Sequence, residues 1–257
     1  MAEWFESESF WVNYAPIMFD EARWAEAPDV ARYVRDIARL KKGDSVLDAG
    51  CGLGRISVEL AALGLDVTGV DVIQAELDAA RESAQAEGVN LELLNADLRT
   101  FKSEKKFDCA VNLYTSFGYC DTLEEDLQIL KNIAGVLKED GTFILECVSR
   151  ETSIMYFTEG EEFERAGFHV RTQFNVEGAW EGLRSRWTLY PAGTNLAEKP
   201  DAKPVVDHVF TQRLYSAAEL CRLMTEECGF ADAKAYGDFD FSPYDQHART
   251  MVIVARR

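Results

Sequence analysis

The chain alternates short apolar runs with longer stretches whose apolar residues recur at helical spacing. Within residues 41–148, the short runs lie at 45–49, 65–70, 89–94, 107–113 and 142–147. Helical spacing fills the stretches between them, at 55–63, 73–87 and 123–137. Strands that alternate with helices form repeated βα units around a mostly parallel sheet. We therefore predict an α/β fold whose core occupies residues 41–148.

Residues 150–215 do not follow this rhythm, because apolar and polar residues alternate along them. The alternation covers 168–176 and 183–189, and 205–215 gives a third strand-like run. We interpret this stretch as an antiparallel β insertion that forms a substrate pocket, a dimer surface, or both. Some arginines on its strands are candidates for binding an acidic group of a substrate, although solvated strand faces explain most arginines. These candidates are Arg171, Arg184, Arg186 and Arg213.

The segment 1–40 precedes the core and carries many aromatic residues. Trp4, Trp11 and Tyr14 recur at helical intervals, which predicts an amphipathic helix. An aromatic stripe of this kind either packs against the body of the protein or covers a ligand as a lid. A second helix is expected to begin at Pro28, because proline is favoured in the first turn of a helix.

Residues 216–257 complete the predicted sheet. Ser216 is a suitable N-cap for a last helix, and two strand-like runs follow at 230–236 and 250–255. We expect these two strands to pair antiparallel. The prediction is a single domain built on a mostly parallel seven-stranded sheet, with helices on both faces and the antiparallel insertion before the last helix.

Charge and composition restrict the partners of the protein. The chain has 45 acidic and 27 basic residues and a formal net charge of −18, so its field repels nucleic acids and anionic membranes. No stretch approaches the ~20 apolar residues of a membrane-spanning helix, and no signal segment is recognisable. We expect a cytoplasmic protein. The six cysteines form no C-x-x-C pair and the three histidines are far apart, so we predict reduced thiols and no metal.

The most informative stretch is Val-Leu-Asp-Ala-Gly-Cys-Gly-Leu-Gly, residues 46–54. An apolar run ends in Asp48, glycines follow at alternate positions, and a helical pattern begins immediately afterwards. Glycine allows the backbone to approach a ligand closely, and the first turn of the helix offers free amide donors. This order predicts a strand, a tight turn and a helix against which a nucleotide-like ligand can lie.

The motif resembles the first motif of class I S-adenosylmethionine-dependent methyltransferases. Dinucleotide sites use G-x-G-x-x-G because a pyrophosphate sits on the helix, whereas the glycines here read G-x-G-x-G. In the methyltransferase family, the glycine turn lies against the methionine portion of the cofactor, and an acid that ends the second strand binds the ribose hydroxyls. The resemblance implies a Rossmann-like fold, with S-adenosylmethionine as cofactor and S-adenosylhomocysteine as product. It implies cofactor contacts at Asp48, Gly50, Cys51, Gly52, Asp71 and Val72.

The same resemblance assigns further cofactor contacts beyond the glycine turn. After the third strand, Asp97 would accept a hydrogen bond from the adenine amino group, and Ala96 and Leu98 would lie beside the base. An aspartate in a loop is often only a turn residue or a helix cap, which is the alternative for Asp97. Leu113, at the end of the fourth strand, and Tyr14, at the methionine end, complete the predicted cofactor site.

Candidate catalytic residues lie in two loops. Residues 115–119, Thr-Ser-Phe-Gly-Tyr, resemble a loop of small-molecule methyltransferases, and the [DNS]-P-P-[YF] motif of nucleic-acid amino methyltransferases is absent. Tyr119 is a candidate for orienting the acceptor or passing on its proton, and His247 is a candidate for proton transfer. The alternatives are that Tyr119 is a packing residue and that His247 is only a surface residue. Glu146 is either an acid or base, or a structural or substrate-orienting carboxylate.

These observations predict an enzyme that transfers a methyl group from S-adenosylmethionine to a nitrogen or oxygen of a small metabolite. In-line transfer depends mainly on positioning, so a dedicated base is not required. The alternatives are a non-catalytic S-adenosylmethionine-binding module whose insertion binds a partner, and a nicotinamide-dependent reductase. The predicted assembly is a monomer or a homodimer formed through the insertion.

Overall fold

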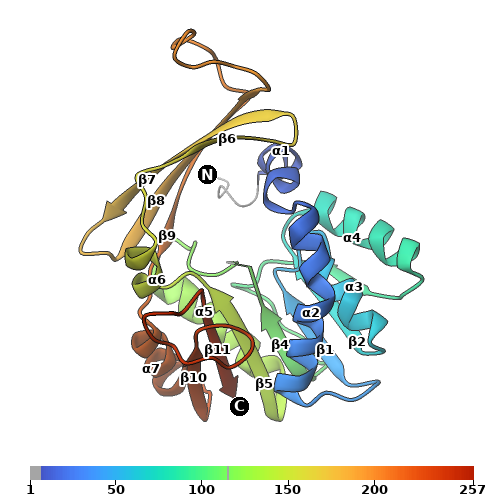
Figure 1. Cartoon of the computed structure of the whole chain (residues 1–257). Helices are drawn as coiled ribbons and strands as arrows, with labels where there is room; N and C mark the ends of the chain where they lie inside the picture. The colour runs from blue at the N-terminus through green and yellow to red at the C-terminus, as the bar shows by residue number, and fades with distance from the viewer. Residues whose placement is uncertain (1–6, 115) are drawn as a thin grey trace.

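The computed structural model describes residues 7–114 and 116–257, so Trp4 and Thr115 lie outside the described residues. Its core is a seven-stranded sheet (Figure 1). From edge to edge the strands are β10 (Asp232–Tyr236), β11 (Met251–Arg256), β5 (Leu137–Cys147), β4 (Phe107–Asn112), β1 (Ser45–Ala49), β2 (Asp66–Asp71) and β3 (Glu92–Asn95). β11 runs antiparallel to both β5 and β10, and the other neighbours are parallel. The prediction of a mostly parallel sheet closed by an antiparallel pair is confirmed.

Helices cover both faces of the sheet, as predicted. Successive residues of a strand point to opposite faces, so Val46 packs in the layer that contains helices α2 (Glu21–Ala38) and α3 (Arg55–Ala62). Leu47 packs in the opposite layer, with α5 (Leu123–Val136) and α7 (Ala217–Glu227). Helix α4 (Gln74–Glu87) lies beside α3 and β3.

The start of α2 differs from the prediction. The helix begins at Glu21, and Pro28 lies inside it rather than in its first turn. Asp20 is the N-cap, because its carboxylate accepts a hydrogen bond of 3.0 Å from the amide of Arg23. By contrast, the predicted cap of the last helix is confirmed, since Ser216 and Glu219 form a capping box at the start of α7.

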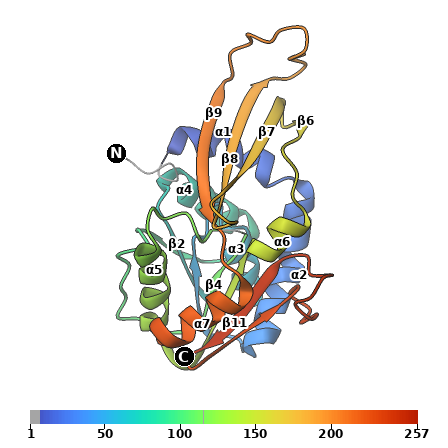
Figure 2. The same ribbon diagram turned by 90° about the vertical axis from the view of Figure 1, so that its left-hand side faces the viewer.

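The antiparallel insertion is confirmed and contains more than predicted. It begins with a short helix, α6 (Arg150–Met155), and its sheet has the order β6 (Glu162–Arg165), β7 (Phe168–Glu177), β8 (Gly182–Pro191) and β9 (Val206–Arg213). All neighbours in this sheet are antiparallel. The edge strand β6 is absent from the sequence prediction. Figures 1 and 2 show, from two directions, that the insertion lies over one end of the strands of the core sheet.

The N-terminal helix α1 (Glu8–Met18) fills part of the space between the insertion and the core. Its buried Ile17 packs with Val170 and Leu189 of the insertion. We call the face of the insertion that carries Leu189 and Trp187 its inner face, and the face that carries Arg186 its outer face. Alternation along β8 places these residues on opposite sides. Helix α1 therefore covers part of the inner face.

Candidate functional site

The glycine turn follows β1 and has the backbone that the sequence predicts. Gly50 and Gly54 have φ angles of +82° and +73°, a region that favours glycine. A Cβ atom on Gly50 would lie 3.0 Å from the Cβ of Ser116, and one on Gly54 would lie 2.6 Å from the Cβ of Ala80. Neither position therefore has room for a larger residue, and we call the glycine turn, residues 50–54, the cradle.

Asp71 holds this turn in place from the end of β2. Its Oδ2 accepts a hydrogen bond of 2.8 Å from the amide of Gly52, and its Oδ1 accepts one of 2.9 Å from the amide of Ile73. Burial raises the pKa of Asp71, while these amide bonds act in the opposite direction. The carboxylate thus joins the glycine turn to the start of α4, at the position where the resemblance expects ribose hydroxyls.

Asp48 lies below the turn rather than on its surface. Its Oδ2 accepts a hydrogen bond of 2.6 Å from the hydroxyl of Ser57 in α3. The side chain is buried, and this burial raises the pKa of Asp48 to about 6. The structure therefore gives Asp48 a structural contact between β1 and α3. Cys51, next in the turn, is also buried, and burial raises the pKa of its thiol well above the usual value.

Two buried polar side chains beside the turn were not predicted from the sequence. The Oε1 atom of Glu76 and the Oδ1 atom of Asn112 have no hydrogen-bond partner among the described residues. A Cβ on Gly52 would lie 3.2 Å from Oε2 of Glu76, and one on Gly50 would lie 3.5 Å from Nδ2 of Asn112. Buried polar atoms are nearly always paired, so a polar ligand in the cradle would supply the missing partners.

Glu76 is the more unusual of the two residues. It occupies the first turn of α4 and is only 6% exposed. Burial, together with the charge of Asp71, raises the pKa of Glu76 to about 8. In the sequence, the unusual environment of Glu76 is indicated only by its position, because the helical pattern places a buried residue there.

The predicted adenine contacts gather at the same edge of the sheet. The amide of Ala96 donates to the carbonyl of Asp71 over 3.0 Å, so the β3 loop lies directly beside the end of β2. Leu98 and Ala96 pack against the core. The carboxylate of Asp97 is hydrogen-bonded to the amide and guanidinium of Arg99, which lowers the pKa of Asp97 against the effect of burial. Asp97 thus also makes the contact of a turn residue, which was the alternative to its role in binding adenine.

The loop after β4 is held by a buried carboxylate. Leu113 is buried, and the amide of Tyr114 donates to Oε2 of Glu146 over 2.7 Å. The hydroxyl of Thr250 donates to the other carboxylate oxygen of Glu146. Burial raises the pKa of Glu146. These contacts fit a structural role for Glu146, one of the interpretations that the sequence left open.

An arginine shields the aromatic ring of Tyr114. The guanidinium carbon of Arg55 lies 4.0 Å from the centre of this ring, and that of Arg23 lies 5.6 Å away. Arg55 is buried at the start of α3, directly after the glycine turn. This stacking joins α2, α3 and the β4 loop, and spacing in the sequence does not reveal it.

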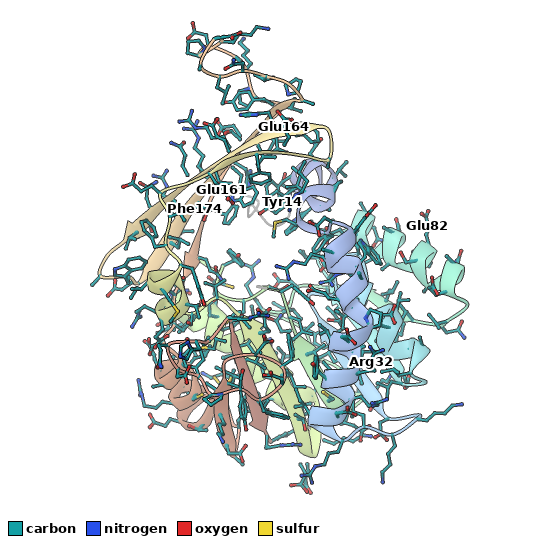
Figure 3. All side chains as sticks on the ribbon, in the orientation of Figure 1. Tyr14, Arg32, Glu82, Glu161, Glu164 and Phe174 are labelled. Carbon is teal, nitrogen blue, oxygen red and sulfur yellow. The ribbon has the colours of Figure 1, made fainter. Side chains whose placement is uncertain are left out.

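Tyr14 and Tyr119 lie at the inner face of the insertion. The ring of Tyr14 is 4.9 Å from that of Trp187 and 4.4 Å from that of Phe10. The ring of Tyr119 is 5.8 Å from that of Phe210 in β9. Burial raises the pKa of each tyrosine, and the charge of Tyr119 raises the pKa of Tyr14 further. Figure 3 shows Tyr14 pointing from α1 toward the insertion.

The structure places His247 at the surface. It is exposed in the loop between β10 and β11, its amide donates to Asp245, and its ring lies 3.2 Å from the amide nitrogen of Gln246. These contacts stay within the loop.

Most of the predicted arginine candidates are bound to acids of the protein. Arg171 pairs with Glu162 and Arg186 with Asp207, and Arg213 pairs with the fully buried Asp126. Arg184 and Arg186 line a polar hollow on the outer face, away from α1. Within the described part of the chain, no group of three His, Cys, Asp or Glu residues is arranged to hold a metal ion. No described helix is both long and apolar enough to cross a membrane.

Comparison with known proteins agrees with this geometry. Residues 46–141 match a family model described as "Methyltransferase domain". The chain is 29% identical over 121 residues to a ubiquinone biosynthesis O-methyltransferase of Rickettsia felis, a match that covers 47% of this chain and 46% of that protein. The chain therefore spans about half the length of this relative. It is 26% identical over 217 residues to the cypemycin N-terminal methyltransferase of a Streptomyces species, with 84% of each protein covered.

A solved structure extends the likeness to the whole fold. An S-adenosylmethionine-dependent methyltransferase from Clostridium acetobutylicum superposes with a TM-score of 0.77 at 15% identity, over 96% of this chain and 98% of the other. This likeness agrees with the order of the core sheet and with the glycine turn that Asp71 closes. Both features lie within or beside the matched domain. Residues 46–141 thus match a methyltransferase domain, and the chain has the fold of a solved S-adenosylmethionine-dependent methyltransferase.

Proposed function

We propose that the protein transfers the methyl group of S-adenosylmethionine to a nitrogen or oxygen atom of a small molecule. The observation that carries this proposal is the cradle at the glycine turn, which Asp71 closes and which the unpartnered oxygens of Glu76 and Asn112 border. By their names, one of the relatives described above is an O-methyltransferase and the other is an N-terminal methyltransferase. The matches therefore leave both oxygen and nitrogen open as the acceptor atom.

The residues of the cradle suit the parts of this cofactor. We assign the ribose hydroxyls to Asp71 and Val72, and the methionine portion to Gly50, Cys51 and Gly52. The adenine would lie against Ala96 and Leu98, with Asp97 beside its amino group, and Leu113 would close the site from the end of β4. In this proposal, Asp48 acts from below by fixing the turn through Ser57.

The chain's own residues would contribute mainly by positioning. When bound, S-adenosylmethionine supplies a methyl carbon that an acceptor lone pair attacks, while the carbon–sulfur bond breaks and its electron pair remains on sulfur. Tyr119 and Tyr14 are proposed to orient the acceptor as uncharged phenols, because a tyrosine is already neutral near pH 7. Tyr119 is the better supported catalytic candidate. His247 stays a candidate for proton transfer from the loop between β10 and β11.

Calorimetric titration with S-adenosylhomocysteine, with NAD as the control, tests the cofactor assignment. We expect selective binding in the micromolar range, about −8 kcal/mol. A methyl-transfer assay with amines, phenols and alcohols then tests the activity. Tight binding of S-adenosylhomocysteine without turnover of any acceptor would favour a non-catalytic binding module, and tighter binding of NAD would reject the methyltransferase proposal.

A further inference from the structure

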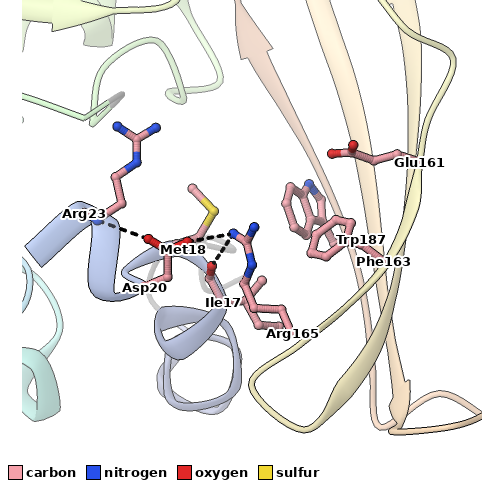
Figure 4. Close-up of a pocket in the computed structure, with 8 residues that line it drawn as sticks. All are labelled: Ile17, Met18, Asp20, Arg23, Glu161, Phe163, Arg165 and Trp187. Atoms are coloured by element: carbon pink, nitrogen blue, oxygen red, sulfur yellow. Dashed lines mark hydrogen bonds and ion pairs between the residues drawn. The ribbon is translucent and has the colours of Figure 1, made fainter.

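A pocket of about 290 Å³ lies between the inner face of the insertion and the junction of α1 with α2 (Figure 4). Phe163 of β6 and Trp187 of β8 form its aromatic wall. Trp187 is fixed edge-to-face against Tyr14, with interplanar angle 85°. The pocket therefore has a preformed apolar side.

The pocket reaches toward the reactive edge of the core sheet. Arg23, at its core side, has its guanidinium carbon 5.6 Å from the centre of the Tyr114 ring. Tyr114 directly follows Leu113 at the end of β4, and its amide is bound to Glu146. In an open α/β sheet, ligands bind beyond the carboxyl ends of the strands, so a molecule in this pocket would extend toward the cofactor cradle.

The basic residues of the pocket already have acidic partners. Arg165 pairs with Asp20 over 3.3 Å, and it also donates to the carbonyl of Ile17 over 3.2 Å. Arg23 pairs with Glu26 over 2.9 Å. An anionic ligand would therefore have to displace an existing ion pair in order to bind either guanidinium.

Glu161 is the charged residue of the pocket that remains unpaired. Within residues 7–114 and 116–257, its carboxylate takes part in no ion pair or hydrogen bond, although its backbone is fixed by Thr172. Figure 4 shows the Glu161 side chain directed into the pocket from the residue just before β6, and Trp187 lines the same space. An unpaired carboxylate beside an indole ring is a favourable environment for a cation.

We propose that this pocket binds the acceptor molecule through a protonated amine, with Glu161 as the counter-ion and Trp187 as an aromatic wall. The pocket itself shows how a cation is accommodated, because the guanidinium carbon of Arg165 lies 5.2 Å from the centre of the Phe163 ring. The net charge of −18 also attracts cations and repels anions at long range. This inference rests on the proposed methyl transfer only in naming the ligand as the acceptor.

Titration of two matched probes tests the pocket without any turnover. Tyramine carries an ammonium group at neutral pH, and 2-(4-hydroxyphenyl)ethanol has the same skeleton with a neutral hydroxyl. Both are titrated by calorimetry or NMR into the full chain saturated with S-adenosylhomocysteine, which has no methyl group to transfer. We expect the wild-type protein to bind tyramine at least about tenfold more tightly than the alcohol.

Two variants on the same segment locate the charge that is responsible. Glu161→Gln removes the charge and keeps the size, so it should weaken tyramine binding about tenfold and leave the alcohol unaffected. Glu162→Gln is the matched control, because Glu162 pairs with Arg171 on the outer face. Binding of S-adenosylhomocysteine by each variant verifies that it is folded.

The outcomes separate this inference from the proposed function. Equal binding of both probes, no saturable binding of tyramine, or unchanged tyramine affinity in Glu161→Gln would overturn the amine pocket. Failure of methyl transfer to every acceptor would instead reject the proposed activity, while the probe titration still decides what the pocket binds.

Discussion

The two sides of the candidate site are built in different ways. At the edge of the core sheet, carboxylates and backbone amides hold the glycine turn, and the residues come from consecutive βα units between Asp48 and Asp97. At the inner face of the insertion, aromatic rings pack together, and they come from distant parts of the chain, with Tyr14, Tyr119 and Trp187 as examples. In the proposed function, the first side holds the cofactor and the second faces the acceptor.

The difference shows how one fold can serve several substrates. Hydrogen bonds to backbone amides fix a turn whatever surrounds it, whereas an aromatic wall can change its shape through single side chains. Polar contacts join the end of β9 to the loop after β4. The amide of Arg213 donates to the carbonyl of Gly118 over 2.6 Å, and the side chain of Gln212 donates to the carbonyl of Phe117 over 3.1 Å.

Removing the ion pair between Arg213 and Asp126 should have the largest effect on stability. Its guanidinium pairs with Asp126, which is fully buried and also accepts a hydrogen bond of 2.8 Å from the hydroxyl of Tyr215. Arg213→Met leaves this carboxylate buried without its cation, which should cost about 3–5 kcal/mol of unfolding free energy. Chemical denaturation measures the loss. Arg222→Met is the control, because Arg222 forms an exposed pair with Glu226 and should change stability by less than about 1 kcal/mol.

Asp71 tests the hydrogen-bonded side of the comparison. Asp71→Ala removes the acceptor of the Gly52 and Ile73 amides together with the proposed ribose contact. The affinity for S-adenosylhomocysteine should fall by about 1–3 kcal/mol, or roughly 5- to 150-fold. Calorimetry measures the change, and tyramine affinity should stay the same if the two sides act independently. An unaltered affinity for S-adenosylhomocysteine would remove Asp71 from the cofactor site.

Glu76, which lies on the hydrogen-bonded side, should make the free energy of unfolding depend on pH. In the unfolded chain its carboxyl ionises near 4.5, whereas burial holds its pKa at about 8 in the folded protein. The folded state therefore binds an extra proton between these values, and the stability from this group is lost as the pH rises through about 8. Glu76→Gln should stabilise the free protein by about 2 kcal/mol near pH 8.5, and this gain should shrink toward about pH 5.

Denaturation curves of both proteins across this pH range measure the effect. Glu82→Gln is the matched control, since Glu82 lies exposed on the same helix α4. A stability difference that does not vary with pH would show that burial of Glu76 has no electrostatic cost. If Glu76→Gln also weakens binding of S-adenosylhomocysteine, the unpartnered Oε1 contributes to the cofactor site.

The sequence predicted the hydrogen-bonded side far better than the aromatic side. The glycine turn, Asp71 and the parallel βα units are local patterns, so spacing along the chain reveals them. Glu76 and Asn112 were missed because their burial depends on the packing of neighbouring units. The start of α2 was missed because Pro28 resembles a first-turn proline, whereas the cap at Asp20 lies further upstream.

Contacts across the insertion could not be predicted for a related reason. Arg213 was a substrate candidate because alternation identifies a strand but not the partner of each side chain, and its partner Asp126 lies on α5. Strand β6 has only 4 residues and three of them are charged, so no apolar alternation marks it. Sequence periodicity therefore predicts helices and strands. It does not predict ion pairs between distant elements, which require the three-dimensional structure.

The smallest expected effect concerns the contact between α1, α2 and the insertion. Arg165 pairs with Asp20 at the surface, where such a pair contributes little. Arg165→Met should lower stability by only about 0.5 kcal/mol, and high salt should remove most of this difference. Asp20 is the less suitable position, since it also caps α2 and its replacement would cost about 1 kcal/mol for that reason alone. Arg184→Met on the outer face is the control. A loss of several kcal/mol in Arg165→Met that persists in high salt would show that the inner face depends on this pair as strongly as the core sheet depends on its buried carboxylates.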